Sequence, residues 1–140
     1  MFRTLEQRRR TWIDFQDLTS PVKRLALVLY DYGLRPWPYP DRWDARVDWA
    51  VSLYEQQLET AMWLDDDRVP AANLHTGTEI FAAAFGCKVA YPGDNMPYAL
   101  HAIEQAADVA RLRVPSITEG PLGEIFEQTD RLREKVGKDA

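Results

Sequence analysis

Hydrophobic residues recur at helical spacing in several stretches of the chain. The longest pattern begins near Asp41 and predicts a helix with one apolar stripe, made of Trp43, Val47, Val51, Tyr54, Leu58 and Ala61. A shorter pattern predicts a first helix from about Leu5 to Leu18, because Thr4 and Gln7 have the spacing of a capping box. These two segments are the clearest helices at the amino-terminal end.

Two further helices are predicted from their end signals. Ser20 and Pro21 form a favourable N-cap and first-turn pair, and the apolar residues that follow predict a helix up to Gly33. The run from Leu25 to Tyr30 also fits a buried strand, but the caps favour a helix. A last helix is expected from Pro121 to Gly137, and its buried side would be Leu122, Ile125, Phe126, Thr129, Leu132 and Val136.

One strand stands out, from Arg68 to Leu74, although Pro70 interrupts it. Thr76 and Glu79 follow at capping-box spacing and predict a helix that Gly86 ends. Three less regular elements are then expected: a short strand at 87–90, a loop at 91–95 and a helix at 104–112. One strand cannot form a stable sheet, so we expect its partners to come from further sequence or from another chain.

Composition narrows the classes of function. The chain has 140 residues, 46% of them hydrophobic, and a net charge of -5, which argues for a folded domain and against a nucleic-acid partner. The basic cluster Arg8, Arg9 and Arg10 is interpreted as a solvated helix face. No apolar run approaches the length of a signal peptide or of a membrane span, and the single cysteine, Cys87, excludes an internal disulfide. We therefore expect a cytoplasmic protein without a membrane partner.

Several motifs in the second half of the chain resemble one family. The run from Trp63 to Pro70 is followed by Thr76–Phe81 and Phe85–Cys87, and later by Asp94–Pro97 and the stretch from Ala106 to Leu132. Together these segments resemble the amino-terminal part of uroporphyrinogen decarboxylase-like proteins, a superfamily that includes cobamide-dependent methyltransferases. The resemblance extends over roughly residues 36–140, and its longest motif spans many residues rather than three letters.

This resemblance implies an α/β protein, a partial (β/α)₈ TIM barrel of which the chain supplies a helix-rich amino-terminal portion with one clear strand. Residues 1–140 would form a single domain, with leading helices at 1–36 and the first barrel units at 37–140. Barrel enzymes place their chemistry at the carboxyl ends of the strands. The turn after the predicted strand is therefore where we expect the site.

Six residues are candidates for that site. His75 is the candidate catalytic residue, as a general base or a carboxylate ligand. The candidate substrate-binding residues are Asn73, Thr76, Thr78, Glu79 and Asn95. Each has a structural alternative, since His75 would suit a surface turn, Glu79 a helix cap and Asn95 a turn after Gly93. The three aspartates Asp65–Asp67 are interpreted as capping groups or as partners of Arg68 rather than as cation ligands, because consecutive residues point in different directions.

The family's cofactor chemistry is not expected within these residues. The authentic decarboxylases carry an arginine-glutamine-alanine-glycine-arginine-tyrosine motif, which is absent here. The methyltransferases bind zinc through a His-x-Cys pair and a distant cysteine. His75, Cys87 and His101 match no such spacing, so no metal site is predicted. Zinc and a cobamide are expected only of a complete protein on the methyltransferase branch.

Two functions remain open from the sequence. The first is an incomplete enzyme, a decarboxylase-like lyase or a cobamide-dependent methyltransferase when completed by further sequence, acting on a small-molecule substrate. The second is a non-enzymatic binding or assembly module derived from the same fold. Both allow a homo-oligomer or a missing carboxy-terminal barrel half as the partner.

Overall fold

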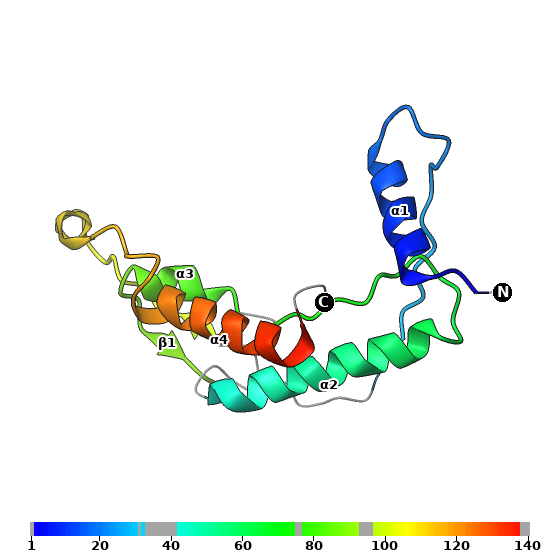
Figure 1. Cartoon of the computed structure of the whole chain (residues 1–140). Coiled ribbons are helices and arrows are strands. Elements are labelled where there is room, and N and C mark those ends of the chain that lie inside the picture. Colours follow the sequence, from blue (N-terminus) through cyan, green and yellow to red (C-terminus); the bar gives the residue numbers. More distant parts are fainter. Residues whose placement is uncertain (1, 31, 33–41, 75–76, 93–96, 138–140) are drawn as a thin grey trace.

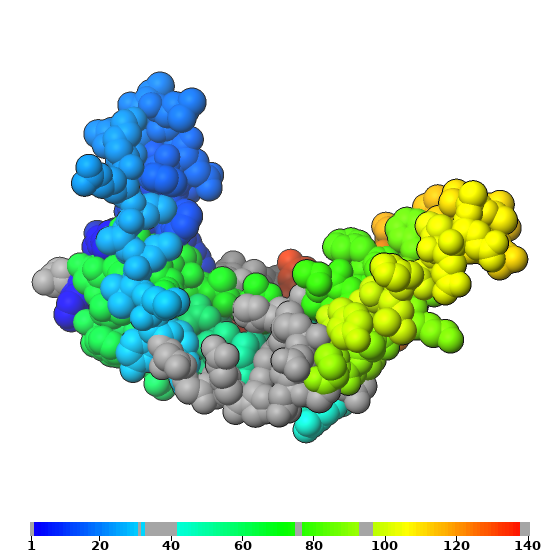
Figure 2. Space-filling model, turned by 180° about the vertical axis from the view of Figure 1, so that it is seen from behind, coloured from blue at the N-terminus to red at the C-terminus, as the bar shows by residue number. Residues whose placement is uncertain are grey.

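The computed structural model describes residues 2–30, 32, 42–74, 77–92 and 97–137. This part of the chain is helix-rich and has one small sheet. Its elements are α1 (Leu5–Gln16), α2 (Trp43–Ala61), α3 (Glu79–Ala84), β1 (Val89–Ala90), β2 (Tyr98–Ala99), the 3-10 helix η2 (Ala106–Arg111) and α4 (Gly120–Val136). Figure 1 shows α2 and α4 side by side in the middle, with α1 rising from the end of α2 where that helix meets residues 62–67. Figure 2 shows α1 with its following segment and residues 100–115 as two projections at opposite ends.

The local signal at the start of α1 acts as the sequence predicts. The Thr4 hydroxyl accepts a hydrogen bond from the N–H of Gln7 at 3.2 Å, and the Gln7 side chain accepts one from the N–H of Thr4 at 2.8 Å. This confirms the capping box. The helix ends at Gln16, before Leu18, which is 92% exposed.

The central core forms where α2 and α4 meet. Val47 and Ala50 of α2 pack with Leu132 of α4 and with Leu74. Among the residues described, five hydrophobic side chains are buried, which is few for a chain of this length. The predicted last helix is confirmed as α4. On its predicted apolar side Leu132 is buried, whereas Phe126 is 56% exposed and does not join the core.

The helix predicted after Pro21 is wrong. Residues 22–30 have no regular secondary structure and run along the aspartates that follow α2. The N–H of Ala26 donates to Asp67 at 2.6 Å, and the N–H of Val28 donates to Asp66 at 2.9 Å. These amides are therefore bonded to carboxylates distant in sequence instead of to carbonyls one helical turn back.

The strand predicted at 68–74 is also wrong, although no helix replaces it. Pro70 and Leu74 are buried, but Ala71 and Asn73 are exposed, so the segment is not buried on both sides. The described residues provide no neighbouring strand to bond its backbone, which explains the irregular conformation. The sheet that does form is an antiparallel pair, in which Val89 lies opposite Ala99.

Two smaller predictions are confirmed in part. The strand expected at 87–90 is present at Val89–Ala90. The helix expected at 104–112 is a 3-10 helix, η2, and none of its residues is buried. In the described parts of the chain, we find no helix whose length and apolar character would let it cross a bilayer.

Candidate functional site

Three of the six predicted site residues lie within the described part of the chain. Outside the described residues lie His75, Thr76 and Asn95. Asn73 and Thr78 have exposed side chains. Glu79 is different, because its side chain is turned inward and is only 5% exposed. The candidate site is therefore built around Glu79.

Glu79 is not the helix cap that its spacing from Thr76 suggested. The N-cap of α3 is Thr78, whose side chain makes no capping hydrogen bond, and Glu79 is the first residue of the helix. A capping box uses the side chain three residues after the N-cap, whereas Glu79 is only one residue after Thr78. Helix α3 does end where Gly86 was expected to stop it, and that glycine has a φ of 91°.

Glu79 lines a cavity of about 110 Å³ that α2, α3, β1 and α4 enclose. Trp43 and Arg46 of α2 form one side, Gly77 and Glu79 form another, and Glu124 of α4 lies at a third. Helix α2 contributes Trp43 and Arg46 together because residues three apart lie on one helix face. The packing of α3 against α4 brings the other residues to the same space.

A buried cation stands in the wall of the cavity. Arg46 is 1% exposed, and its guanidinium lies 4.7 Å from the centre of the Trp43 ring. Burial lowers the pKa of Arg46, while the nearby Glu79 carboxylate and Tyr91 act in the opposite direction. Arginine remains charged in proteins, so the cavity has a permanent positive group.

The anionic group of the cavity has hydrogen-bonding capacity to spare. The Oε2 oxygen of Glu79 is enclosed, and no described residue donates a hydrogen bond to it. A methyl group at Gly77 would lie 1.8 Å from that oxygen, so a larger residue there would displace the end of the Glu79 side chain. A buried carboxylate oxygen that accepts no hydrogen bond is costly, so this oxygen is available to a ligand or to water.

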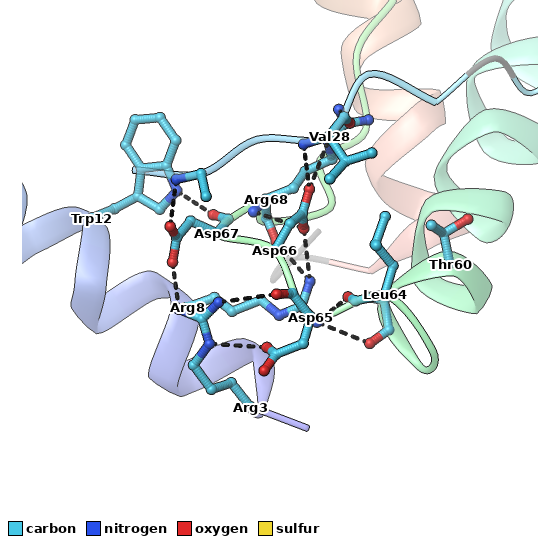
Figure 3. A network of polar contacts seen from close by, with 12 residues as sticks. Arg3, Arg8, Trp12, Val28, Thr60, Leu64, Asp65, Asp66, Asp67 and Arg68 are labelled. Carbon is cyan, nitrogen blue, oxygen red and sulfur yellow. Dashed lines mark hydrogen bonds and ion pairs between the residues drawn. The ribbon is translucent and has the colours of Figure 1, made fainter. Parts of the chain in front are cut away.

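A second polar cluster joins the amino-terminal segment to the end of α2 (Figure 3). Its cations are Arg3, Arg8 and Arg68, and its anions are Asp65, Asp66 and Asp67. Every carboxylate of the aspartate run faces at least one arginine, and Trp12 of α1 adds a hydrogen bond to the Asp67 carbonyl at 2.6 Å. The predicted pairing with Arg68 is confirmed for Asp66, whose oxygen lies 3.9 Å from the Arg68 Nε.

The interpretation of Arg8 as part of a solvated face is wrong. Arg8 is 1% exposed and donates to Asp66 at 3.3 Å and to three backbone carbonyls. Those carbonyls belong to Ala61, the last residue of α2, and to Leu64 and Arg68 in the segment that follows it. Because the carbonyls at a helix end lack partners within the helix, a guanidinium with five N–H donors is well suited to them.

Ionisation of the aspartates reflects these contacts. The N–H of Ala26 holds the pKa of Asp67 below its ordinary value, and Arg3 adds to the effect. The hydrogen bond from Arg3 likewise lowers the pKa of Asp65. Asp65 and Asp67 therefore stay ionised at neutral pH. Among the described residues, the cluster holds α1 and residues 22–30 against the end of α2.

Sequence reasoning missed Arg46 and Arg8, although one signal was present for Arg46. Its neighbours on the helical face are Trp43, three residues before it, and Ala50, four residues after it. A charged residue within an apolar stripe indicates a buried ion or a site. For Arg8 the sequence has no such signal, because Arg9 and Arg10 beside it are exposed.

Candidate metal ligands were compared among the described residues only. Within the described ranges, no three residues among histidine, cysteine, aspartate and glutamate are grouped so that they could hold a metal ion. Cys87 is half-buried and His101 is exposed. Neither residue lines the cavity.

Comparisons with known proteins give one match. A family model described as uroporphyrinogen decarboxylase (URO-D) matches residues 61–140, which is more than half of the chain. A search of curated proteins and a search of solved structures each returned no match. The matched residues include α3, α4 and Glu79, but not the Arg46 side of the cavity.

Proposed function

Because the chain belongs to the uroporphyrinogen decarboxylase family, we propose that it is the amino-terminal portion of a barrel enzyme of that superfamily. The branch we favour is the methyltransferase-like or uncharacterised one, with a small-molecule substrate and a cytoplasmic location. The family match over residues 61–140 carries the proposal. By itself the chain would be incomplete for catalysis, since a barrel site draws residues from the ends of several strands.

Apolar surface supports the idea of a larger assembly. Large side chains are exposed over the whole described part of the chain, among them Leu29 at 96%, Val114 at 92% and Phe81 at 69%. Exposed apolar area of this extent is typical of a surface that another part of a protein covers. Further barrel strands and helices would supply that cover.

The choice of branch rests on motifs. The arginine-rich motif that holds substrate carboxylates in the authentic decarboxylases is absent from the sequence, which favours another substrate than a tetrapyrrole. Zinc, which the methyltransferase branch uses, does not fit the residues described, because one cysteine and no His-x-Cys pair are present. Its ligands would have to come from other sequence, and no step of a reaction is assigned to it.

The proposal is tested by assaying the purified chain of 140 residues. We expect no decarboxylation of porphyrinogens and no methyl transfer from a methylcobamide to a thiol, and we expect self-association through exposed apolar surface. Mass in solution is measured on the same sample. Turnover by a monodisperse monomer would contradict the proposal.

A genetic observation separates the branches. The nucleotide sequence after the Ala140 codon should encode more barrel strands and, on the methyltransferase branch, a His-x-Cys pair with a later cysteine. Further barrel strands without that pair and cysteine would favour the uncharacterised branch. An immediate stop codon together with a stable dimer would favour a binding or assembly module instead.

A further inference from the structure

We propose that a small cavity beside Arg8 holds one internal water molecule, which bridges the guanidinium of Arg8 and the hydroxyl of Tyr32. The cavity lies where α1 meets the end of α2, and it shares no lining residue with the cavity at Glu79. The proposal does not depend on the barrel activity, because the groups that hold the water belong to the chain itself. The site can therefore be tested without turnover.

Two buried polar atoms identify the site. The Nε of Arg8 and the hydroxyl oxygen of Tyr32 are both enclosed, and neither has a hydrogen-bond partner among the described residues. Both residues line the same cavity. A buried polar atom without a partner is costly, and internal waters are found where they satisfy such groups.

The contacts of Arg8 decide the kind of ligand. Its Nη1 donates to the Asp66 carboxylate and to the Arg68 carbonyl. Its Nη2 donates to the carbonyls of Ala61 and Leu64 (Figure 3). Of the five N–H groups of a guanidinium, these bonds leave the Nε–H. Asp66 already compensates the charge of Arg8, so the site requires a neutral acceptor and not an anion.

The volume of the cavity limits the ligand to one water. At about 10 Å³ the cavity is close to the ~10–15 Å³ that a single water requires. An organic molecule does not fit this space. Water is therefore the neutral hydrogen-bonding ligand that matches both the size and the chemistry.

The wall offers enough partners to hold a water. Its oxygen would accept from the Nε–H of Arg8, and one of its hydrogens would be donated to the Tyr32 oxygen. The other hydrogen has an acceptor in Thr60, whose hydroxyl lines the cavity and uses its own hydrogen on the Gln56 carbonyl at 2.8 Å. Internal waters typically make about three hydrogen bonds, so this set is complete.

The water would connect three segments of the chain. Arg8 belongs to α1, Thr60 belongs to α2, and Tyr32 lies beyond the stretch that follows α1. No hydrogen bond joins the Tyr32 hydroxyl directly to either helix among the described residues. The bridging water is thus what ties Tyr32 to the buried pair of Arg8 and Asp66.

The test is NMR of the ¹⁵N-labelled full chain, observed at the Nε–H signal of Arg8. We expect a nuclear Overhauser effect between this proton and water, with opposite signs in the laboratory and rotating frames, as for a water that tumbles with the protein. Absence of this signal would overturn the proposal.

Variants assign the partners of the water. Tyr32→Phe keeps the ring and removes the hydroxyl, so it should weaken the water signal at least twofold. Tyr30→Phe is the matched control and should leave the signal unchanged, because Tyr30 is 42% exposed and does not line the cavity, although its ring packs against Tyr32. Equal signals in the two variants would overturn the assignment of Tyr32.

Thr60→Val separates a bound water from hydrogen exchange at the Tyr32 hydroxyl. This variant keeps the Tyr32 hydroxyl and removes one partner of the water, so the signal should again fall at least twofold. An unchanged signal would show that it arises from the hydroxyl and would overturn the proposal.

A crystal structure of the unsubstituted chain gives an independent result if a variant loses helical circular dichroism. We expect a water within hydrogen-bond distance of the Arg8 Nε and the Tyr32 oxygen. A direct hydrogen bond between these two atoms would overturn the proposal.

Discussion

Replacement of Arg8 by methionine tests how the amino-terminal segment is held. Methionine keeps the length of the unbranched stem and removes the guanidinium, which makes four hydrogen bonds. The variant leaves the buried Asp66 carboxylate without one of its cations and leaves the carbonyls of Ala61, Leu64 and Arg68 without this donor. Desolvated groups without partners are the physical cause of the expected loss.

The magnitude follows from the burial of the pair. Arg8 is 1% exposed and Asp66 is 4% exposed, so solvent screens their attraction little. Removing one partner of a buried pair costs about 3–5 kcal/mol. Four hydrogen bonds counted separately would exceed this, but the contributions of groups in one network do not add. Asp66 also retains the N–H groups of Val28 and Arg68. We expect the free energy of unfolding to fall by about 3–5 kcal/mol.

Urea denaturation followed by circular dichroism measures the loss. With a slope of about 1–3 kcal/mol per molar urea, the midpoint should fall by about 1–5 M. Arg10→Met is the matched control, because Arg10 is exposed on the same helix and pairs only with Asp14 one turn away among the contacts described. That pair is worth about 0.5 kcal/mol or less.

Hydrogen exchange locates the effect. The amides of Ala26 and Val28 donate to Asp67 and Asp66, so they should exchange faster in Arg8→Met if the segment 22–30 is released. A loss below about 1 kcal/mol, equal to that of the control, would refute the argument that Arg8 holds this region.

Three further predictions concern acid stability, the core and activity. Because the N–H of Ala26 and then Arg3 lower the pKa of Asp67, ionised Asp67 stabilises the fold above about pH 4, and this contribution is lost as pH falls through the lowered pKa. Acid unfolding of Asp67→Asn should therefore depend less on pH between about 5 and 2; an unchanged pH dependence would contradict this. Leu132→Ala should lower the free energy of unfolding by about 2–5 kcal/mol in urea denaturation, whereas Phe126→Ala, at an exposed position, should change it by less than about 1 kcal/mol. Equal losses would contradict the core assignment. The purified chain should be silent in both family assays, and turnover by a monomer would refute that expectation.

Elements with local signals were predictable from the sequence. The capping box of Thr4 and Gln7 fixes the start of α1, because both groups that satisfy the free N–H groups lie within one turn. The apolar spacing and the flanking Pro121 and Gly137 likewise predicted α4 within one or two residues. Membership of the family was also readable in the motifs from Trp63 to Pro70 and beyond, as the match over residues 61–140 confirms.

Other features depend on groups distant in sequence, which only the tertiary structure brings together. Residues 22–30 carry helix signals after Pro21, yet the carboxylates of Asp66 and Asp67 bind their amides, some 40 residues away along the chain. The same distance hides the burial of Arg8, since its partners are the free carbonyls at the end of α2. The cavity at Glu79 arises in the same way, because α4 packs against both α2 and α3. Local spacing determines which helices can form, and long-range hydrogen bonds and ion pairs decide which polar groups become buried.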